Sequence, residues 1–406
     1  MFGFFAGKIA NLIGYLAAPS QRPAHFLTHI HLHRIKSIQG MKNTYVAIMA
    51  GGIGSRFWPA SRVHRPKQFL DILGTGQSLI QLTYERFLNL CPKEHIFVVT
   101  NAQYRDLVLE QLPDLTPNQV LCEPSRNNTG PCVAYTAFKL HDLDPDANFI
   151  VAPSDHLVVK ETAFVTALKT ALDFTAKHDA LCTLGIQPTR PDTGYGYIQY
   201  EADPTAPAPD HEDVGGVHKV VEFKEKPDAA TAQQYLDAGN YLWNAGIFVW
   251  RAAAVLDAFE RNANEIYEIL KTGRGKYNTP EEQAYIDATY PTTPSISVDY
   301  AIMERAQNIH TIPADIGWSD LGTWASLHEE MDGDDHHNTI QGGTVLTLDA
   351  DNCLIRAPKD KLVIVKDLDN FIIVDEGDVL MIYPKDKEQE IKAVTKRVGE
   401  INTDFV

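Results

Sequence analysis

The sequence predicts an α/β fold with a mixed, mainly parallel sheet, followed by a small β-rich unit. From residue 45 onward, short apolar runs alternate with longer amphipathic segments, which is typical of parallel strands connected by helices that cover both faces of a sheet. Turn residues follow several of these runs. After residue 335 the apolar runs become shorter and closely spaced, which indicates a unit made mostly of strands.

The elements of the first unit follow from these runs in chain order. We expect strands at residues 45–49, 96–100, 119–122, 148–152, 180–185, 217–224 and 241–250. We expect helices near residues 78–90, 102–112, 130–142, 161–177, 252–270 and 297–306. Residues 203–216, rich in Pro, Ala, Asp and Gly, predict a surface loop rather than a domain break.

The chain divides into three predicted parts. Residues 1–40 contain no Asp or Glu and precede a second methionine, so we interpret them as an extension that is disordered or not native. Residues 41–335 form the α/β domain, and residues 336–406 form the β-rich domain, which ends in a charged helix. Its expected strands are at residues 344–348, 353–356, 361–366, 371–375 and 379–383.

Composition and charge narrow the function classes. The formal charge of −17 argues against a general nucleic-acid or anionic-membrane binder, so a polyphosphate would need a local cluster of cations. Lys8 interrupts the apolar stretch from Phe2 to Ala18, which is short for a membrane span, so we expect no stable membrane association. Five widely spaced cysteines, an odd number, indicate reduced thiols in a cytoplasmic protein.

A glycine-rich turn after the first expected strand predicts a phosphate-binding loop. Gly51, Gly52 and Gly54 let backbone N–H groups approach phosphate oxygens, and Arg56 and Lys67 can neutralise the charge. Ser55 lies within the same turn. No Gly-Lys-Ser/Thr follows, and Phe57 stands where a dinucleotide fingerprint has its third glycine, so two commoner phosphate loops are excluded.

Two aspartates are candidate metal ligands. Asp155 follows the strand at residues 148–152, and Asp320 lies in a turn far along the chain. Two carboxylates together with phosphate oxygens and water can hold one Mg²⁺, which prefers oxygen ligands. The residues alone leave a helix-capping role open for both aspartates.

Three further motifs contain groups that could contact a ligand. Lys226, beside Glu225, ends an alternating strand, where a solvated strand end is the alternative. Asn244 is a polar group in a very apolar strand and needs a partner, either a ligand hydroxyl or a backbone group. Gly196 belongs to a second turn that permits close approach of a ligand.

Read as a whole, residues 45–69 resemble the signature of sugar-nucleotide pyrophosphorylases. The Phe57-Trp58-Pro59 and Pro66-Lys67-Gln68-Phe69 elements are most similar to the mannose-1-phosphate guanylyltransferase (GDP-mannose pyrophosphorylase) family, and the later motifs follow in the family's order up to about Ile391. The resemblance implies a Rossmann-like nucleotidyltransferase domain and a β-helix-like C-terminal domain.

The resemblance also implies roles for individual residues. Asp155 and Asp320 would bind Mg²⁺, Arg56 and Lys67 the triphosphate, and Lys226 the sugar phosphate. The hexose would contact Gly196, Glu225 and Asn244. Glu123, Asn128 and Thr129 match the base and ribose motif, and Glu123 could accept from the amino and imino edge of guanine, which favours that base. Asn127 occupies the motif's usual cation position, and Arg126 lies one residue earlier.

The expected reaction is transfer of GMP from GTP to α-D-mannose 1-phosphate, giving GDP-mannose and pyrophosphate with Mg²⁺, in a homo-oligomer, most simply a dimer. One alternative is another hexose-1-phosphate nucleotidyltransferase that uses glucose 1-phosphate with another triphosphate. A second is a noncatalytic regulatory paralogue. The presence of the expected catalytic residues argues against the second alternative; they are Arg56, Lys67, Asp155, Lys226 and Asp320.

Overall fold

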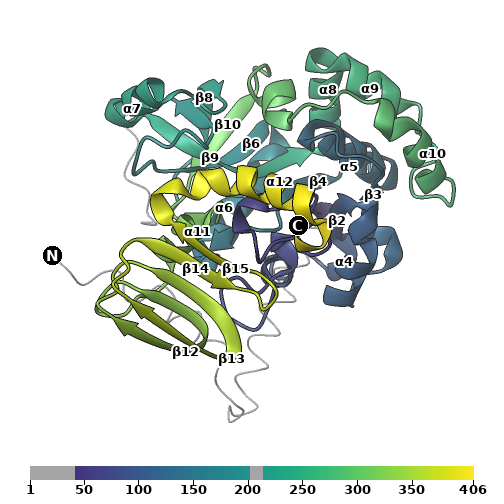
Figure 1. The fold of residues 1–406 in the computed structure, drawn as a ribbon. Helices are drawn as coiled ribbons and strands as arrows, with labels where there is room; N and C mark the ends of the chain where they lie inside the picture. The colour runs from purple at the N-terminus through teal and green to yellow at the C-terminus, as the bar shows by residue number, and fades with distance from the viewer. Residues whose placement is uncertain (1–41, 202–213) are drawn as a thin grey trace, which may run out of the picture.

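The computed structural model describes residues 42–201 and 214–406 (Figure 1). The predicted extension and most of the predicted loop at residues 203–216 lie outside these ranges. A nine-stranded sheet forms the body of the protein, in the order β3-β2-β1-β4-β9-β6-β10-β8-β7. Its strands are β1 (Thr44–Met49), β2 (Ile96–Asn101), β3 (Val120–Glu123), β4 (Asn148–Pro153), β6 (Leu181–Ile186), β7 (Tyr197–Tyr200), β8 (His218–Lys224), β9 (Tyr241–Arg251) and β10 (Ile309–Pro313).

The sheet is mixed and mainly parallel, which confirms the predicted fold class. Strands β3, β2, β1 and β4 are parallel, and β9 joins β4 in the antiparallel sense. The carboxyl ends of β1, β3 and β4 therefore meet at one edge of the sheet, where open α/β sheets bind their ligands. This edge carries the glycine turn and the residues that follow Glu123 and Pro153.

Helices cover both faces of the sheet because its strands are apolar on both sides. In β1, Val46 and Ile48 pack into one core, and Tyr45 and Ala47 into the other. The helices of the body are α3 (Leu79–Phe87), α4 (Arg105–Gln111), α5 (Thr129–Leu143), α6 (Glu161–Lys177), α7 (Ala229–Ala238), α8 (Ala252–Asn262), α9 (Asn264–Lys271), α10 (Glu282–Thr289) and α11 (Trp324–Glu330). In the described part of the chain, no helix has the length and apolar character needed to span a bilayer.

Two helix predictions need correction. The single helix expected at residues 252–270 is two helices, because Ala263, with φ −142° and ψ 51°, leaves the helical conformation between α8 and α9. The helix expected at residues 297–306 is a π-helix, η7, that covers only Asp299–Met303. Strands β7 and β10 and helices α7, α10 and α11 were not predicted.

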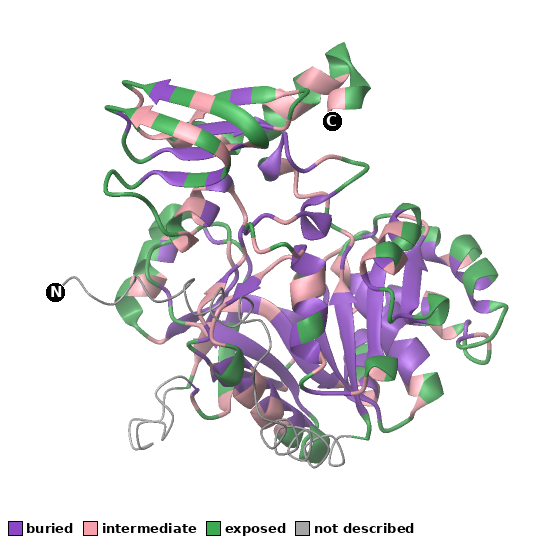
Figure 2. Ribbon diagram, turned by 90° about the horizontal axis from the view of Figure 1, so that it is seen from below, coloured by how far each residue is buried: buried purple, intermediate pink, exposed green. Residues whose placement is uncertain are grey.

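The C-terminal unit is a four-stranded sheet followed by helix α12 (Ile391–Ile401). Its strands are β12 (Thr339–Leu348), β13 (Leu354–Lys366), β14 (Phe371–Asp375) and β15 (Leu380–Pro384). The two strands predicted at residues 353–356 and 361–366 are one continuous strand, β13. The parallel pairing of β12, β13 and β14 agrees with the predicted β-helix-like character. In Figure 2 this sheet forms a separate layer beside the buried central sheet.

The C-terminal unit packs against the segment that follows the glycine turn. Leu354, Ile372 and Val374 share a core with Phe57 and Trp324. Directional contacts supplement this core. The indole nitrogen of Trp58 donates to the backbone oxygen of Phe405 at 2.7 Å, and Arg62 forms a bidentate ion pair with Asp378 at 2.7 and 2.6 Å.

Candidate active site

The glycine turn has a fixed backbone. Gly54 has φ 63°, and a Cβ at this position would lie 2.5 Å from the Cβ of Lys67, so both the conformation and the space require glycine. The side-chain amide of Gln68 donates to the backbone oxygens of Ala50 at 2.9 Å and Gly52 at 3.0 Å. A Cβ on Gly52 would meet no atom within 4 Å, so this residue faces open space.

Arg56 lies on a short 3₁₀ helix, η1 (Ser55–Phe57), directly after the turn. It is exposed, whereas the neighbouring Phe57 is buried. The guanidinium is near Glu388 of the C-terminal unit. Burial raises the pKa of Glu388, and Arg56 partly offsets that rise. Arg56 is thus a cation at the mouth of the loop, with a carboxylate as its neighbour.

Lys67 is buried and lies between the two predicted metal ligands. Its ammonium nitrogen is 3.1 Å from Asp155 Oδ2 and 3.0 Å from the backbone oxygen of Asp320, and only 2% of the residue is exposed. It also lies 5.3 Å from the centre of the Phe57 ring. The predicted phosphate-binding cation and the predicted metal ligands therefore form one cluster.

A pair of very short strands brings the two aspartates together. β5 (Leu157–Val158) pairs in the antiparallel sense with β11 (Trp318–Ser319), so the turns on either side of these strands become neighbours. The Asp320 carboxylate accepts from the Tyr195 hydroxyl at 2.9 Å and from the Gly322 N–H at 3.0 Å.

The charges of this cluster follow from its contacts. Burial alone would raise the pKa of Asp155, but the nearby Lys67 ammonium, together with His156 and a backbone hydrogen bond, outweighs burial and holds the pKa below its usual value. Burial lowers the pKa of His156, which favours a neutral ring. The ring accepts a hydrogen bond at Nδ1 from the Trp318 indole at 3.1 Å. Asp155 is thus ionised at neutral pH next to an uncharged imidazole.

The carboxylates suit a hard divalent cation only if the substrate completes its shell. The described residues supply no side-chain donor for the second oxygen of Asp155 or of Asp320, which leaves two hard oxygen ligands. In the same residues, no group of three or more His, Cys, Asp or Glu could hold a metal ion. A Mg²⁺ here would need water and phosphate oxygens for its other ligands, as this ion accepts readily.

A cavity of about 220 Å³ is lined by all four predicted sugar-phosphate residues. Its lining includes Thr129, Gly196, Glu225, Lys226, Asn244 and Asp320, together with Tyr195, Trp318 and Asp299. The glycine turn, Glu123, Asn128 and Asp155 do not line it. Asp320 thus belongs both to the Lys67 cluster and to this cavity.

Glu225 and Lys226 are paired within the cavity. Lys226 has φ 46°, and its ammonium binds Glu225 Oε1. A Cβ on Gly196 would lie 2.6 Å from Glu225 Oε2, so glycine is required for this close packing. The Lys226 side chain is 57% exposed, which leaves it accessible to an anion.

The amide of Asn244 is mostly engaged within the protein. Its Oδ1 lies 3.0 Å from the Thr183 hydroxyl and 3.2 Å from the Gly246 N–H, and its Nδ2 donates to Asp299 Oδ1 at 3.1 Å. Asp299 was missed in the sequence because the run around it indicated only a helix. A carboxylate within the apolar run from Val298 to Met303 was the available signal.

The base-side loop is held by the segment before Asp299. The Tyr290 hydroxyl donates to Glu123 Oε1, and burial raises the pKa of Glu123 to about 7 although this hydrogen bond opposes the rise. The Asn127 amide donates to the backbone oxygens of Tyr290 at 3.1 Å and Thr293 at 2.8 Å. Asn127 therefore connects the base-side loop to residues 290–293 by buried hydrogen bonds and does not replace the cation of the family motif.

The remaining base-side residues also make internal contacts. Asn128 has φ 68°, and its side chain accepts from the Thr129 N–H at the start of α5. The Thr129 hydroxyl accepts from the Val298 N–H at 2.9 Å. Arg126 donates to the Tyr104 hydroxyl at 3.0 Å. A base or ribose contact from Asn128 or Thr129 stays a prediction.

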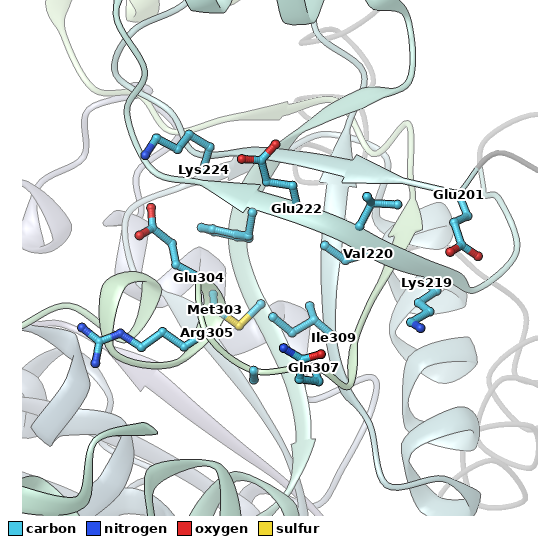
Figure 3. Close-up of a pocket in the computed structure, with 13 residues that line it drawn as sticks. Glu201, Lys219, Val220, Glu222, Lys224, Met303, Glu304, Arg305, Gln307 and Ile309 are labelled. Atoms are coloured by element: carbon cyan, nitrogen blue, oxygen red, sulfur yellow. The ribbon is translucent and has the colours of Figure 1, made fainter. Parts of the chain in front are cut away.

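A second cavity lies beside β8, and none of the predicted site residues lines it. It measures about 540 Å³ and is lined by residues of β8 and of the stretch from Met303 to Ile309 (Figure 3). Glu304 connects it to the sugar-phosphate cavity, because Glu304 Oε1 accepts from the Glu225 N–H at 3.0 Å. Lys224 and Glu304 approach its rim from different elements (Figure 3).

The fold and the paired carboxylates beside a glycine turn define a nucleotidyltransferase. A family model described as nucleotidyl transferase matches residues 45–336, and one described as MannoseP isomerase/GMP-like beta-helix domain matches residues 343–398. The first match covers more than half of the chain. The chain therefore belongs to the nucleotidyl transferase family and is an enzyme of that class.

Within this family, similar relatives are named for alginate biosynthesis, xanthan biosynthesis and mannose-1-phosphate guanylyltransferase activity. Alginate biosynthesis protein AlgA of Pseudomonas syringae pv. tomato is 37% identical over 87% of this chain and 71% of the relative. Mannose-1-phosphate guanylyltransferase RfbM of Salmonella typhimurium is 36% identical over 86% of this chain and 71% of the relative. Xanthan biosynthesis protein XanB of Xanthomonas campestris is 35% identical over 88% of this chain and 74% of the relative. The predicted resemblance to the mannose-1-phosphate guanylyltransferase family is confirmed.

Solved structures agree with this placement. A protein of Thermus thermophilus, described as a mannose-1-phosphate geranyltransferase, has a TM-score of 0.77 and 30% identity, covering 88% of this chain and 99% of that chain. A mannose-6-phosphate isomerase of Helicobacter pylori has a TM-score of 0.55 at 24% identity, and the match covers 68% of this chain and 99% of that chain. The second likeness shows the fold alone.

Proposed function

We propose that the protein transfers GMP from GTP to α-D-mannose 1-phosphate, giving GDP-mannose and pyrophosphate. The contact of Lys67 with both Asp155 and Asp320 carries this proposal, because it joins the glycine turn to the cavity that contains Lys226. The names of the relatives favour mannose and guanine over other sugars and bases.

The chain's residues meet the needs of this reaction. The N–H groups of the turn bind the triphosphate, with Arg56 as the exposed cation. Lys226 binds the phosphate of the sugar. Each cation lowers the repulsion between two polyanions that must come into contact. Mg²⁺ held by Asp155 and Asp320 would add Lewis-acid polarisation of the phosphate oxygens.

The reaction needs no nucleophile from the protein. A phosphate oxygen of the sugar phosphate forms a bond to the α-phosphorus of GTP, and the bond from that phosphorus to the β-bridging oxygen breaks. Pyrophosphate leaves with the electron pair of this bond. The protein's contribution is to align the two reactants and to stabilise the negative charge that grows on the leaving group, and we assign this stabilisation to Arg56 and Lys67.

Partners and location follow from the same proposal. The substrates are small and anionic, and the formal charge of −17 argues against nucleic acid as a partner. All five cysteines are buried and unpaired, which fits a reducing cytoplasm. We further propose that the protein works as a homo-oligomer, most simply a dimer.

A substrate panel tests the proposal. Release of pyrophosphate would be measured for GTP, ATP, UTP and dTTP, each with mannose 1-phosphate and with glucose 1-phosphate, with and without MgCl₂. We expect the highest kcat/KM for GTP with mannose 1-phosphate and no turnover without the metal. Preference for glucose 1-phosphate with another triphosphate would identify a sister pyrophosphorylase, and no turnover with any pair would identify a noncatalytic paralogue.

A further inference from the structure

We propose that Asp299 accepts a hydrogen bond from one hydroxyl of the sugar and is a specificity-determining residue for the hexose. This inference rests on the proposed function, since it assumes a hexose 1-phosphate in the 220 Å³ cavity.

Asp299 occupies an unusual position in the backbone. It is the first residue of the π-helix η7, which follows directly on the segment that holds the base-side loop. Single π-helical turns occur frequently at functional sites, because the wider turn redirects side chains. The Asp299 side chain lines the same cavity as Glu225, Lys226 and Asn244.

An account of hydrogen bonds favours Asp299 over Asn244 as the group that contacts the sugar. The acceptor oxygen of Asn244 lies within hydrogen-bond distance of two donors, the Thr183 hydroxyl and the Gly246 N–H. One of its two N–H groups donates to Asp299. An amide oxygen has two lone pairs, so Asn244 can offer a ligand only a single N–H.

The cavity holds two further carboxylates, and both are partly engaged: Asp320 accepts from Tyr195 and Gly322, and Glu225 is paired with Lys226. Glu225 Oε1 binds the Lys226 ammonium, Oε2 packs against Gly196, and the backbone N–H of Glu225 is held by Glu304. The Asp299 carboxylate accepts from the Asn244 amide and is also hydrogen-bonded by the Ser297 side chain and a backbone N–H. An ionised carboxylate has about four acceptor positions, so Asp299 keeps one for a hydroxyl of the sugar.

The charge state of Asp299 suits an acceptor role. Burial, together with the nearby Glu225 carboxylate, raises the pKa of Asp299 to about 6. The group is therefore mostly ionised at pH 7.5 and cannot donate. A hydrogen bond from a hydroxyl to an ionised acceptor is stronger than one between neutral groups. A sugar that lacks the matching hydroxyl would leave this partly buried charge without its partner.

The test uses Asp299→Asn in the full-length protein. An asparagine can keep the acceptor oxygen for Asn244 while it replaces the other carboxylate oxygen with an N–H₂ donor. The kcat/KM of wild type and variant would be measured for mannose 1-phosphate and for its 2-, 3-, 4- and 6-deoxy analogues with GTP. For the parent sugar phosphate, we expect the variant to lose about 10- to 100-fold.

The ratio of kcat/KM between wild type and variant, compared across the analogues, shows whether Asp299 contacts a hydroxyl of the sugar. For one deoxy analogue, the ratio of wild type to variant should fall to within about twofold, because the interacting hydroxyl is already absent. An equal ratio for all five sugar phosphates would overturn the proposal and assign Asp299 a structural role. Absence of wild-type turnover with mannose 1-phosphate would instead refute the proposed function.

Glu282→Gln provides a matched control for the change from carboxylate to amide. Glu282 is also buried and hydrogen-bonded, to Tyr135 at 2.5 Å and to Lys139 at 2.9 and 2.6 Å, but it lies outside the cavity. Its substitution should lower the midpoint of thermal unfolding and should show the same ratio for every analogue. An analogue-dependent ratio in this control would contradict the assignment to Asp299.

Discussion

The ammonium nitrogen of Lys67 lies 3.1 Å from Asp155 Oδ2, and both groups belong to loops at the carboxyl ends of neighbouring parallel strands. The same nitrogen is 3.0 Å from the backbone oxygen of Asp320. Lys67 therefore connects the glycine turn, the two candidate metal ligands and, through Asp320, the sugar-phosphate cavity. Its removal should affect charge as well as geometry.

Replacement of Lys67 by Met should raise the pKa of Asp155, because Lys67 is the largest influence that holds this pKa down against burial. If the ionised form of Asp155 is required, the acid limb of the pH profile of kcat/KM should move to higher pH. We expect kcat/KM at pH 7.5 to fall by the equivalent of about 2–4 kcal/mol. Lys93→Met is the control, since Lys93 forms an exposed ion pair with Asp114. An acid limb that stays in place in the Lys67 variant would contradict the prediction.

Arg56→Ala should separate catalysis from stability. The side chain is exposed, so we expect little change in the free energy of unfolding. We expect a loss of about 2–4 kcal/mol in transition-state stabilisation, as for the removal of one preorganised electrostatic contact. Asp155→Ala should lose a similar amount of activity. Pyrophosphate release and thermal unfolding would be measured on the same samples, and undiminished turnover in either variant would disprove its assigned role.

Gly54→Ala and Gly52→Ala should behave differently. At Gly54 the new Cβ would lie 2.5 Å from that of Lys67 and the residue has φ 63°, so we expect a lower unfolding temperature without ligand. At Gly52 the new Cβ meets no protein atom within 4 Å. We expect this variant to keep its stability but to bind GTP more weakly, as measured by titration calorimetry. Gly76→Ala, with φ 88° and open space, shows the effect of conformation alone.

Ionisation of Glu123 should make the protein less stable as the pH rises. Burial raises the pKa of Glu123 to about 7 from its ordinary value of 4.5, so between these values the folded state binds more protons than the unfolded state. The free energy of unfolding therefore falls through this window, by at most about 3 kcal/mol from this group. In Glu123→Gln this contribution is absent.

Urea titrations from pH 5 to pH 8 would check this. The difference in the free energy of unfolding, variant minus wild type, should increase with pH across that range. Parallel curves for the two proteins would show that Glu123 is not responsible. Because the Tyr290 hydroxyl opposes the rise in the pKa of Glu123, Tyr290→Phe should extend the decline to higher pH.

Much of the fold could be predicted from the sequence because its signals are local. The buried strands around Val46 and Ile150 are apolar and bounded by turns. The turn after the first strand requires glycine at position 54, where φ is positive. Strands β5 and β11 have two residues each, too few for a periodic pattern. The pairing that brings Asp155 to Asp320 was therefore implied only by family resemblance.

Other parts of the site depend on contacts between distant residues. The sequence identified Asn244 as a polar group that needs a partner, but its partners include Thr183 and Asp299, which lie far from it in the chain. The hydrogen bond from Asn127 to the backbone of Tyr290 could not be predicted either, since the position of Asn127 in the motif indicated a cation site. Such choices depend on tertiary packing, which a single sequence does not encode in any local pattern.

The hydrogen bond from the Trp58 indole to the backbone of Phe405 has a practical consequence. Trp58 lies two residues after Arg56, the cation that we propose for the triphosphate, and its indole holds the backbone of Phe405. An affinity tag fused to Val406 would begin one residue after Phe405. We expect such a tag to disturb the Trp58 contact and, through it, the position of Arg56. Kinetic work on this protein should therefore compare tagged material with protein from which the tag has been cleaved.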